Sequence, residues 1–481
     1  MPFRRLLGPA LLAAAFALSG CDETQSGPVR VSAIGAPPEM VNPNLQPMDA
    51  ASAFLIEATA QGLVRFDAAG EIEPALAQSW IVSDDGLRYT FRIRRAQWPD
   101  GSRVTAEQVA ARLQATVSRA SRSPLKPALG AMEDAEAMTD QVLEISLRGP
   151  RPNLLQLLAQ PELAIAVNER GAGPYRVEES EDGVLRLAPI PGEDESEPTS
   201  RPDILLRGEP AALAVARFAQ NETDLVTGGT IGTLPFARAA GLGGDRLLFD
   251  PAAGLFGLAF ASAEGPLADP AVRAALSMAI DRQALIATLA VPGLQPSLVL
   301  MPQTADEVPN PAVPAWAASP MPMRRELATR TIAALDAPLR IRVAMPAGPG
   351  YRLVFAHLRR DWRLIGIEAE PVGLDAPAEL RLIDAVAPGR LAGWYLRHFT
   401  CDAAPVCDAE ADAALQAARV APSAAERRVQ LAIADRIFAE LTPFIPLASP
   451  VRWSLVAPRL NGFRPNPFAR HPADTLIAPE S

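Results

Sequence analysis

The sequence of 481 residues is poor in several side chains that carry chemistry. It contains three cysteines, three histidines and a single lysine, Lys126. Acidic residues outnumber basic ones by 55 to 45, which gives a formal net charge of −10 at pH 7. Surfaces that bind nucleic acid are basic, so this acidic composition does not indicate a protein that binds DNA or RNA. The excess of arginine over lysine is better explained by compositional bias than by phosphate recognition.

Long apolar runs are also scarce, and the longest lies close to the N-terminus, from Leu6 to Leu18. It is shorter than the roughly 20 residues that a membrane-spanning helix needs. The Leu-Ser-Gly-Cys motif that ends at Cys21 is typical of a lipobox, so residues 1–20 are predicted to be a cleaved signal peptide and Cys21 to be lipidated. An ordinary secretory signal, with Cys21 unmodified, is the alternative.

The residue after the lipobox, Asp22, is similar to the inner-membrane retention signal of some lipoproteins. We therefore expect a periplasmic protein anchored to the inner membrane by Cys21. With about 150 residues per domain, the mature chain should contain about three structural units.

The remaining two cysteines lie in the segment His398-Phe-Thr-Cys401-Asp-Ala-Ala-Pro405-Val-Cys407. In an oxidising compartment an even pair predicts a disulfide, here Cys401 with Cys407. Pro405 favours a turn between them, and closing so short a loop contributes roughly 2 kcal/mol. A metal site and free thiols are alternatives, although the spacing from His398 matches no standard zinc pattern.

Strands and helices are both predicted along the chain. Residues 29–34 indicate a strand, and residues 53–62 a helix. Residues 87–94 alternate between apolar and polar side chains, which is typical of a strand with one wet face. This strand ends at the turn sequence Trp-Pro-Asp-Gly at 98–101. Thr105 and Gln108 then form a capping box that starts a helix, and residues 142–147 indicate another strand.

Two later helices have clear start signals. Asp269 is placed to cap the first, with Pro270 at its first helical position. Ser423 and Glu426 form the capping-box pattern of the second, and its apolar spacing predicts the buried side Val429, Ile433, Ile437 and Leu441. The mixture of elements predicts an α/β or α+β protein with more than one lobe.

Several segments in a fixed order resemble family 5 of the extracellular solute-binding proteins, the peptide and nickel type that feeds ABC importers. They are Gly-Leu-Val-Arg-Phe-Asp at 62–67, Glu-Pro-Ala-Leu-Ala-Gln-Ser-Trp at 73–80, Trp-Pro-Asp-Gly at 98–101, Gly-Ala-Gly-Pro-Tyr at 171–175, and Pro-Leu-Ala-Asp-Pro-Ala-Val-Arg-Ala-Ala-Leu at 266–276. Ala-Ile-Asp-Arg at 279–282 and Asn-Gly-Phe at 461–463 continue the pattern. Most of these residues have structural roles, so they identify the fold and say little about the ligand.

The resemblance implies a two-lobed α/β periplasmic-binding-protein fold, of type II, with an extra subdomain. The implied division has a tether at 21–28 and lobe I in three parts, 29–48, 171–257 and 447–481. The inserted subdomain would span 49–170, and lobe II 258–446. Ligand would lie between the lobes, which close on it by hinge motion. Partners would be an ABC permease and its ATPase and a small, peptide-like solute; we expect a monomer with no resident cofactor.

One departure from the family concerns the second lobe. Peptide binders commonly have there an Asp-Pro segment whose aspartate grips the peptide amino terminus, and residues 381–398 contain no such pair. Asp384 is the natural substitute, while Trp394 and Tyr395 suit the lining of a cleft and Arg397 could meet a ligand carboxylate. The predicted ligand-binding residues are Asn42, Asp384, Trp394, Tyr395 and Arg397.

Other functions remain open at this point. A nickel or metal-chelate ligand held through His398 is one alternative within the same fold. A lipoprotein that senses its ligand without transporting it is another. An enzyme is not expected, because neither His357 nor His471 lies in a nucleophile motif such as G-x-S-x-G.

Overall fold

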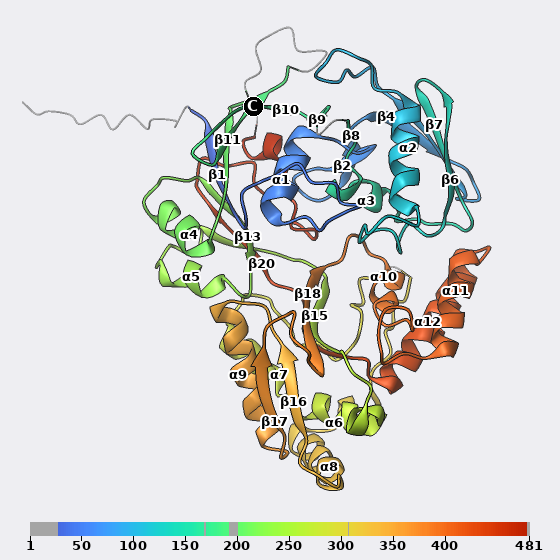
Figure 1. Ribbon diagram of the computed structural model, residues 1–481, viewed down its shortest axis with the longest axis vertical. Helices are drawn as coiled ribbons and strands as arrows, with labels where there is room; N and C mark the ends of the chain where they lie inside the picture. The colour runs from blue at the N-terminus through green and yellow to red at the C-terminus, as the bar shows by residue number, and fades with distance from the viewer. Residues whose placement is uncertain (1–26, 168–169, 192–200, 306, 479–481) are drawn as a thin grey trace, which may run out of the picture.

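The computed structural model describes residues 27–167, 170–191, 201–305 and 307–478. These residues form an upper and a lower body with different parts of the chain in each (Figure 1). The upper body contains the N-terminal half and the C-terminal tail, and the lower body contains residues from about 254 to 448. No helix in this part of the chain is long and apolar enough to cross a membrane.

A seven-stranded mixed sheet organises the upper body, in the order β10-β11-β12-β1-β13-β20-β14. Its central strands β12, β1 and β13 run parallel, and the flanking pairs are antiparallel. The strands are β1 (Val29–Ile34), β10 (Tyr175–Glu181), β11 (Val184–Pro189), β12 (Ile204–Glu209), β13 (Leu225–Thr230), β14 (Leu247–Asp250) and β20 (Arg452–Val456). Helices α1 (Ala50–Thr59), α4 (Ala211–Ala219) and α5 (Leu234–Ala239) accompany this sheet.

A four-stranded antiparallel sheet, in the order β4-β5-β7-β6, forms the inserted part of the upper body. Its strands are β4 (Ala77–Val82), β5 (Arg88–Ile93), β6 (Met132–Thr139) and β7 (Val142–Leu147), and helices α2 (Ala106–Val117) and α3 (Leu154–Leu158) accompany it. Two short hairpins join it, β2 (Val64–Phe66) with β3 (Ile72–Pro74) and β8 (Ala166–Val167) with β9 (Arg170–Gly171). Along β5 the side chains alternate between core and surface, as its sequence predicts, because successive residues of a strand point to opposite sides.

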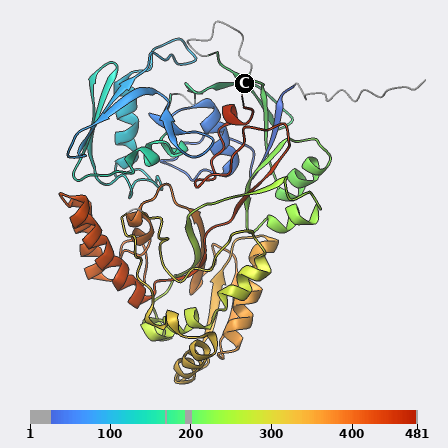
Figure 2. The ribbon, with the colours of Figure 1, turned by 180° about the vertical axis from the view of Figure 1, so that it is seen from behind.

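The lower body is built on a five-stranded sheet, in the order β17-β16-β18-β15-β19. The strands are β15 (Gly254–Phe260), β16 (Arg340–Ala344), β17 (Glu368–Val372), β18 (Leu380–Val386) and β19 (Phe444–Ala448). The helices are α6 (Pro270–Ala279), α7 (Arg282–Leu289), α8 (Met321–Ala333), α9 (Pro349–Arg363), α10 (Ala392–Arg397), α11 (Ala409–Val420) and α12 (Ala424–Leu441). Figure 2 shows α11 and α12 directly below the four-stranded sheet of the upper body. Short 3₁₀ turns lie at Pro161–Leu163, Gly265–Ala268, Ala315–Ala318 and Ala473–Thr475.

The chain passes between the two large sheets twice, from β14 to β15 and from β19 back to β20. Two short connections of this kind allow the bodies to move about a hinge. The predicted residue limits of the lobes and the subdomain stay a prediction, because the order of strands alone does not define where each unit ends.

The helix starts predicted from the sequence are confirmed, with one difference. Thr105 and Gln108 form both hydrogen bonds of a capping box, and Asp269 accepts a hydrogen bond from the backbone N–H of Ala271. Ser423 accepts from the N–H of Glu426, but the Glu426 carboxylate accepts from the Ser423 hydroxyl and not from the backbone N–H. Ser423 therefore caps α12 without the reciprocal bond.

The predicted buried side of α12 does not match the buried positions, because Val429 is 57% exposed and Ile433, Ile437 and Leu441 are only half-buried. The buried positions are Arg427, Leu431, Ala434, Asp435 and Phe438. Arg427 can be buried because it pairs with the carboxylate of Glu307, which lies on a loop far away in the sequence. Buried charges need such a partner, and the spacing of apolar residues cannot show it.

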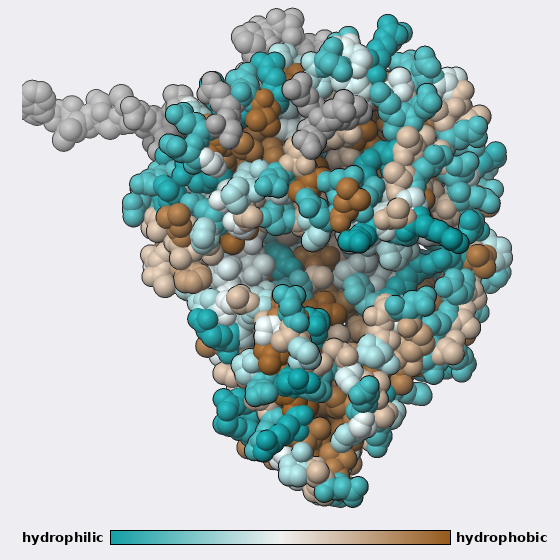
Figure 3. Space-filling view, viewed as in Figure 1, coloured by the Kyte–Doolittle hydropathy of each residue, from teal (hydrophilic) through white to brown (hydrophobic). Residues whose placement is uncertain are grey.

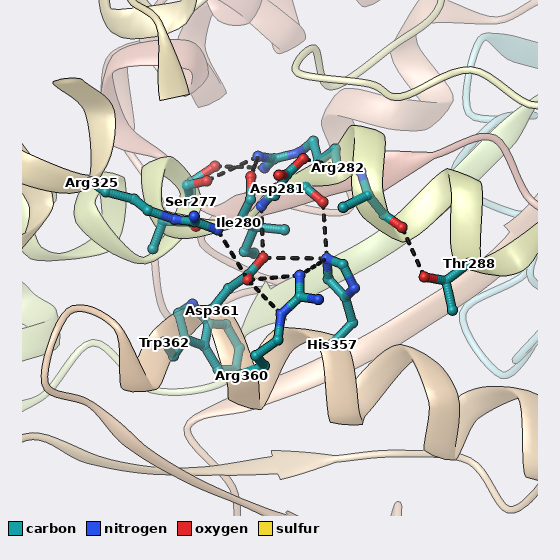
Figure 4. Close-up of polar contacts among 12 residues, drawn as sticks. Ser277, Ile280, Asp281, Arg282, Thr288, Arg325, His357, Arg360, Asp361 and Trp362 are labelled. Atoms are coloured by element: carbon teal, nitrogen blue, oxygen red, sulfur yellow. Dashed lines mark hydrogen bonds and ion pairs between the residues drawn. The ribbon is translucent and has the colours of Figure 1, made fainter. Parts of the chain in front are cut away.

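The Ala-Ile-Asp-Arg segment of the family pattern has a structural role in the lower body (Figure 4). Arg282 is buried and donates to the carbonyls of Pro446 and Ser277. The backbone N–H of Asp281 donates to the fully buried carboxylate of Asp361, 2.7 Å away, which also pairs with Arg325. These contacts join α6, α7, α8 and α9 in one polar cluster, and none of these residues lines the cleft between the two bodies.

Candidate functional site

A cleft of about 700 Å³ lies between the upper and lower bodies. Figure 3 shows a recess in this face of the molecule between the two bodies. Such a volume is within the range of cavities that bind small molecules. Apolar side chains make up most of the lining; the polar ones are Gln160, Glu162, Arg381, Arg397, His398 and Arg470.

Strand β18 lines the lower-body side of the cleft, which we call the floor. Arg381, Ile383 and Ala385 line the cleft, whereas Leu382 belongs to the core of the lower body. This alternation follows from the period of two in a β-strand. The strand pairs with β15, whose last residues, Ala259 and Phe260, also reach the cleft.

The same alternation turns Asp384 away from the cleft. Its carboxylate forms an ion pair with Arg452 of β20 at 2.7 Å and accepts a hydrogen bond from the Tyr351 hydroxyl, also at 2.7 Å. Only 5% of the Asp384 side chain is exposed. Tyr351 and Arg452 come from different bodies, so Asp384 joins the two bodies beside the connecting strands. It is not among the residues that line the cleft.

Helix α10 presents one side to the cleft. Trp394, Arg397 and His398 line it, a spacing of three and four residues that places them on one helix face. The rings of Trp394 and His398 meet edge to face, with centroids 4.6 Å apart. Tyr395 faces the other way and is 1% exposed in the core between α10, α11 and α12. Of the two predicted aromatic residues, the structure therefore places one in the cleft.

The protonation of His398 is fixed by its neighbours. Nδ1 lies 2.8 Å from the carbonyl oxygen of Trp394, and a carbonyl can only accept, so Nδ1 carries the proton. Burial lowers the pKa of His398. In the neutral ring Nε2 is then a hydrogen-bond acceptor.

Arg397 spans the cleft at its edge. Its Nη1 donates to the carbonyl oxygen of Pro127 in the upper body, 2.5 Å away. Burial, together with the positive charges of Arg419 and Arg427, lowers the pKa of Arg397 to about 10, so the guanidinium is charged at neutral pH. Within the described chain, no carboxylate forms an ion pair with it.

The loop after α10 completes one wall of the cleft. Cys401 and Cys407 form a disulfide, with 2.09 Å between the two Sγ atoms, and Ala403, Ala404 and Pro405 between them line the cleft. The thiol groups are thereby not free to bind a metal. Among the residues that the structure describes, no group of three or more histidine, cysteine or acidic side chains could hold a metal ion.

The upper-body side of the cleft, which we call the roof, contains an arginine between two carboxylates. Arg470 lies 3.6 Å from Glu57 and 4.0 Å from Glu162. Burial raises the pKa of Glu57. Oε2 of Glu162 is buried and has no hydrogen-bond partner among the described residues. Glu162 is the one acidic residue in the lining of the cleft.

Side chains of the upper body bind the main chain of the lower body along the rim. Gln160 donates to the carbonyl of Pro388 at 2.8 Å, and Asn153 donates to that of Arg390 at 3.2 Å. Arg151 donates to the carbonyl of Arg419 at 2.8 Å. Together with Arg397, these contacts hold the bodies against each other beside the cleft.

Like Asp384 and Tyr395, the predicted ligand-binding residue Asn42 does not line the cleft. Asn42 is exposed in a turn, where its side-chain oxygen accepts from the N–H of Asn44 at 3.0 Å. Cys21 lies outside the described residues, so its lipidation stays a prediction. Sequence reasoning missed Glu162, Arg381 and Arg470 as lining residues, because they come from three segments that only the fold brings together.

Comparison with known proteins agrees with this architecture. The family model of bacterial extracellular solute-binding proteins, family 5 Middle, matches residues 71–395. A probable deoxycholate-binding periplasmic protein of Escherichia coli K12 is 31% identical over 121 residues, which cover 21% of this chain and 23% of that protein. The nickel-binding periplasmic protein of the same strain is 28% identical over 337 residues, 65% of this chain and 60% of that protein.

The chain therefore matches less than two thirds of the length of either relative. Among solved structures, the Escherichia coli murein tripeptide binding protein MppA is similar over 94% of this chain and 98% of its own, with 19% identity and a TM-score of 0.81. This likeness concerns the fold, which is the two-lobed fold of periplasmic binding proteins. The family match covers most of the chain, which accordingly belongs to the family 5 bacterial extracellular solute-binding proteins.

Proposed function

We propose that this protein captures a small solute in the cleft and delivers it to the permease of an ABC importer. The observation that carries the proposal is a largely apolar cleft of about 700 Å³ between two bodies joined by two connecting segments. A ligand that touches both bodies binds the closed form better than the open form, and so shifts the equilibrium toward closure. The permease would recognise this closed form.

The names of the relatives do not decide the ligand, since one names deoxycholate and another nickel. A metal alone has little support from the cleft, because His398 is the one lining side chain there with an unprotonated ring nitrogen. A peptide-like or other organic solute suits the apolar lining better. Lipidation at Cys21 would keep the protein at the inner membrane beside its permease, as the sequence predicts.

The rim contacts give the proposal a structural basis for closure. Gln160 and Arg397 each donate to a carbonyl across the gap between the bodies. The neutral bond from Gln160 contributes about 1 kcal/mol and the bond from the charged Arg397 about 2 kcal/mol, so removing either should favour opening without unfolding either body.

The test is native mass spectrometry of the mature protein, without its lipid, after purification from a periplasm. We expect a bound molecule of a few hundred daltons that is lost on gentle denaturation. Small-angle scattering before and after its removal should show a larger radius of gyration for the empty protein. Trp394→Ala should lose the bound mass, whereas Trp80→Ala, on a strand away from the cleft, should retain it. An empty wild-type protein whose scattering never changes with small-molecule extracts would contradict the proposal.

A further inference from the structure

The chemistry of the cleft lining narrows the class of ligand. Resting on the proposed function, we propose that the cleft binds an apolar solute with one carboxylate group, and that Arg397 binds this carboxylate. The apolar part would lie between Trp394, Phe260 and the floor strand β18.

No acidic side chain of β18 lines the floor of the cleft. At the end of β18 the cleft is lined by Ala385, Val386, Ala387 and Pro388, none of which can bind an ammonium group through a charge. The nearby acid, Asp384, is already paired with Arg452. A ligand whose recognition depends on an amino group would find no carboxylate on this side of the cleft.

Arg397 is charged and has a hydrogen-bond partner but no ion-pair partner among the described residues. A guanidinium has five N–H donors in a rigid fork, and one of them binds the carbonyl of Pro127. Its neighbouring charges, Arg419 and Arg427, are also positive, and Glu307 is engaged by Arg427. The lowered pKa of Arg397 reflects burial and these like charges. A carboxylate in the cleft would supply the missing counter-charge, and an arginine fork matches its two oxygens.

Other charged side chains of the lining lie on both sides of the cleft. Arg381 also reaches the cleft and binds the carbonyl of Leu374, so it adds a second positive charge on the floor. The negative charge of Glu162 lies on the roof and is shared with Arg470. Glu162 is the one acidic side chain in the lining, and an ionised carboxylate can only accept, so a hydroxyl or amino group at the far end of the ligand would suit it.

Two kinds of small molecule have this chemistry, a hydroxylated apolar acid and an apolar peptide with a free carboxyl end. Isothermal titration of the ligand-free mature protein would separate them. The probes are deoxycholate and its methyl ester, and trileucine with its C-terminal amide and its N-acetyl form. For at least one pair, we expect the acid to bind at least tenfold more tightly than the ester or amide, because a hydrogen bond to a charged group is lost.

The variant Arg397→Gln should reduce the affinity of the acid at least tenfold and leave the ester or amide unchanged. Arg397→Lys, which keeps the charge but loses the fork, should give an intermediate value. Arg428→Gln, at an exposed position on α12, is the matched control and should bind like wild type. If trileucine is the ligand, N-acetylation and Glu162→Gln should each weaken its binding. If deoxycholate is the ligand, its hydroxyl groups would donate to Glu162 instead of the amino group.

Equal binding of acid and ester or amide would overturn the proposal, as would an Arg397→Gln variant with wild-type affinity for the acid. Failure of all the probes would overturn the assignment of an apolar acid. The proposed function would survive that result if native mass spectrometry still showed a bound molecule of another kind, so the two failures can be told apart.

Discussion

The buried carboxylate of Asp435 gives a prediction whose size and pH dependence can both be worked out. Asp435 lies on α12, is 2% exposed, and accepts one hydrogen bond, from the N–H of Ala312 at 2.6 Å. It lines a small cavity together with apolar side chains such as Leu300 and Phe438. Burial raises the pKa of Asp435 to about 6, and the hydrogen bond from Ala312 offsets only part of this effect.

A pKa raised from 3.8 to about 6 means that the folded protein holds this proton more tightly than the unfolded chain does. The stability contributed by the protonated group is therefore complete below about pH 4 and is lost as the pH rises through about 6. Each unit of pKa shift corresponds to about 1.4 kcal/mol, so the loss amounts to about 3 kcal/mol at pH 7.

Asn is close in shape to the protonated acid, and its oxygen can still accept from Ala312. Asp435→Asn should therefore raise the free energy of unfolding by up to about 3 kcal/mol at pH 7.5 and change it little at pH 4. Urea unfolding followed by tryptophan fluorescence at several pH values between 4 and 7.5 would measure this. Asp402→Asn, at an exposed acid on the same body, is the control and should show no such trend. A difference between Asp435→Asn and wild type that is the same at all pH values would refute the reasoning.

Three further predictions concern stability. Asp384→Ala should lower the free energy of unfolding by about 3 kcal/mol, because Arg452 would keep a largely buried charge without its partner; an unchanged urea midpoint would count against this. Intact-mass measurement should find the protein two daltons lighter than its reduced form, and Cys401→Ser should cost about 2 kcal/mol by freeing the loop to Cys407; equal masses before and after reduction would show free thiols. Gly350→Ala should prevent stable folding, since the added Cβ would lie 1.7 Å from a backbone carbonyl oxygen; normal thermal unfolding of this variant would contradict the packing.

The elements that the sequence predicts well are those set by neighbours in the chain. The capping box of Thr105 and Gln108 lies within one helical turn, and so does the cap formed by Asp269. The alternation in β5 is likewise local, since side chains on a strand follow a period of two. These features needed no knowledge of distant contacts, and the structure confirms them.

The cleft was predicted less well, because it depends on which side of each element faces it. The period of two separates Asp384 from Arg381 and Ile383, but it does not say which group faces the ligand. The sequence predicts that Asp384 faces the cleft. In the structure its side chain lies on the opposite face of β18 and pairs with Arg452, which is 68 residues away in the sequence. On α10 the spacing of Trp394 with Arg397 and His398 was visible and could have separated Trp394 from Tyr395.

The arrangement around Arg397 links ligand binding to closure. One donor of its guanidinium crosses to Pro127 of the upper body, so the arginine is held at the cleft edge only when the bodies are close together. A ligand carboxylate bound there would stabilise the same side-chain position, and the contact with Pro127 would in turn hold the fork toward the ligand. Binding free energy at Arg397 would then favour the closed form over the open one, which is the condition for a ligand to drive the conformational change.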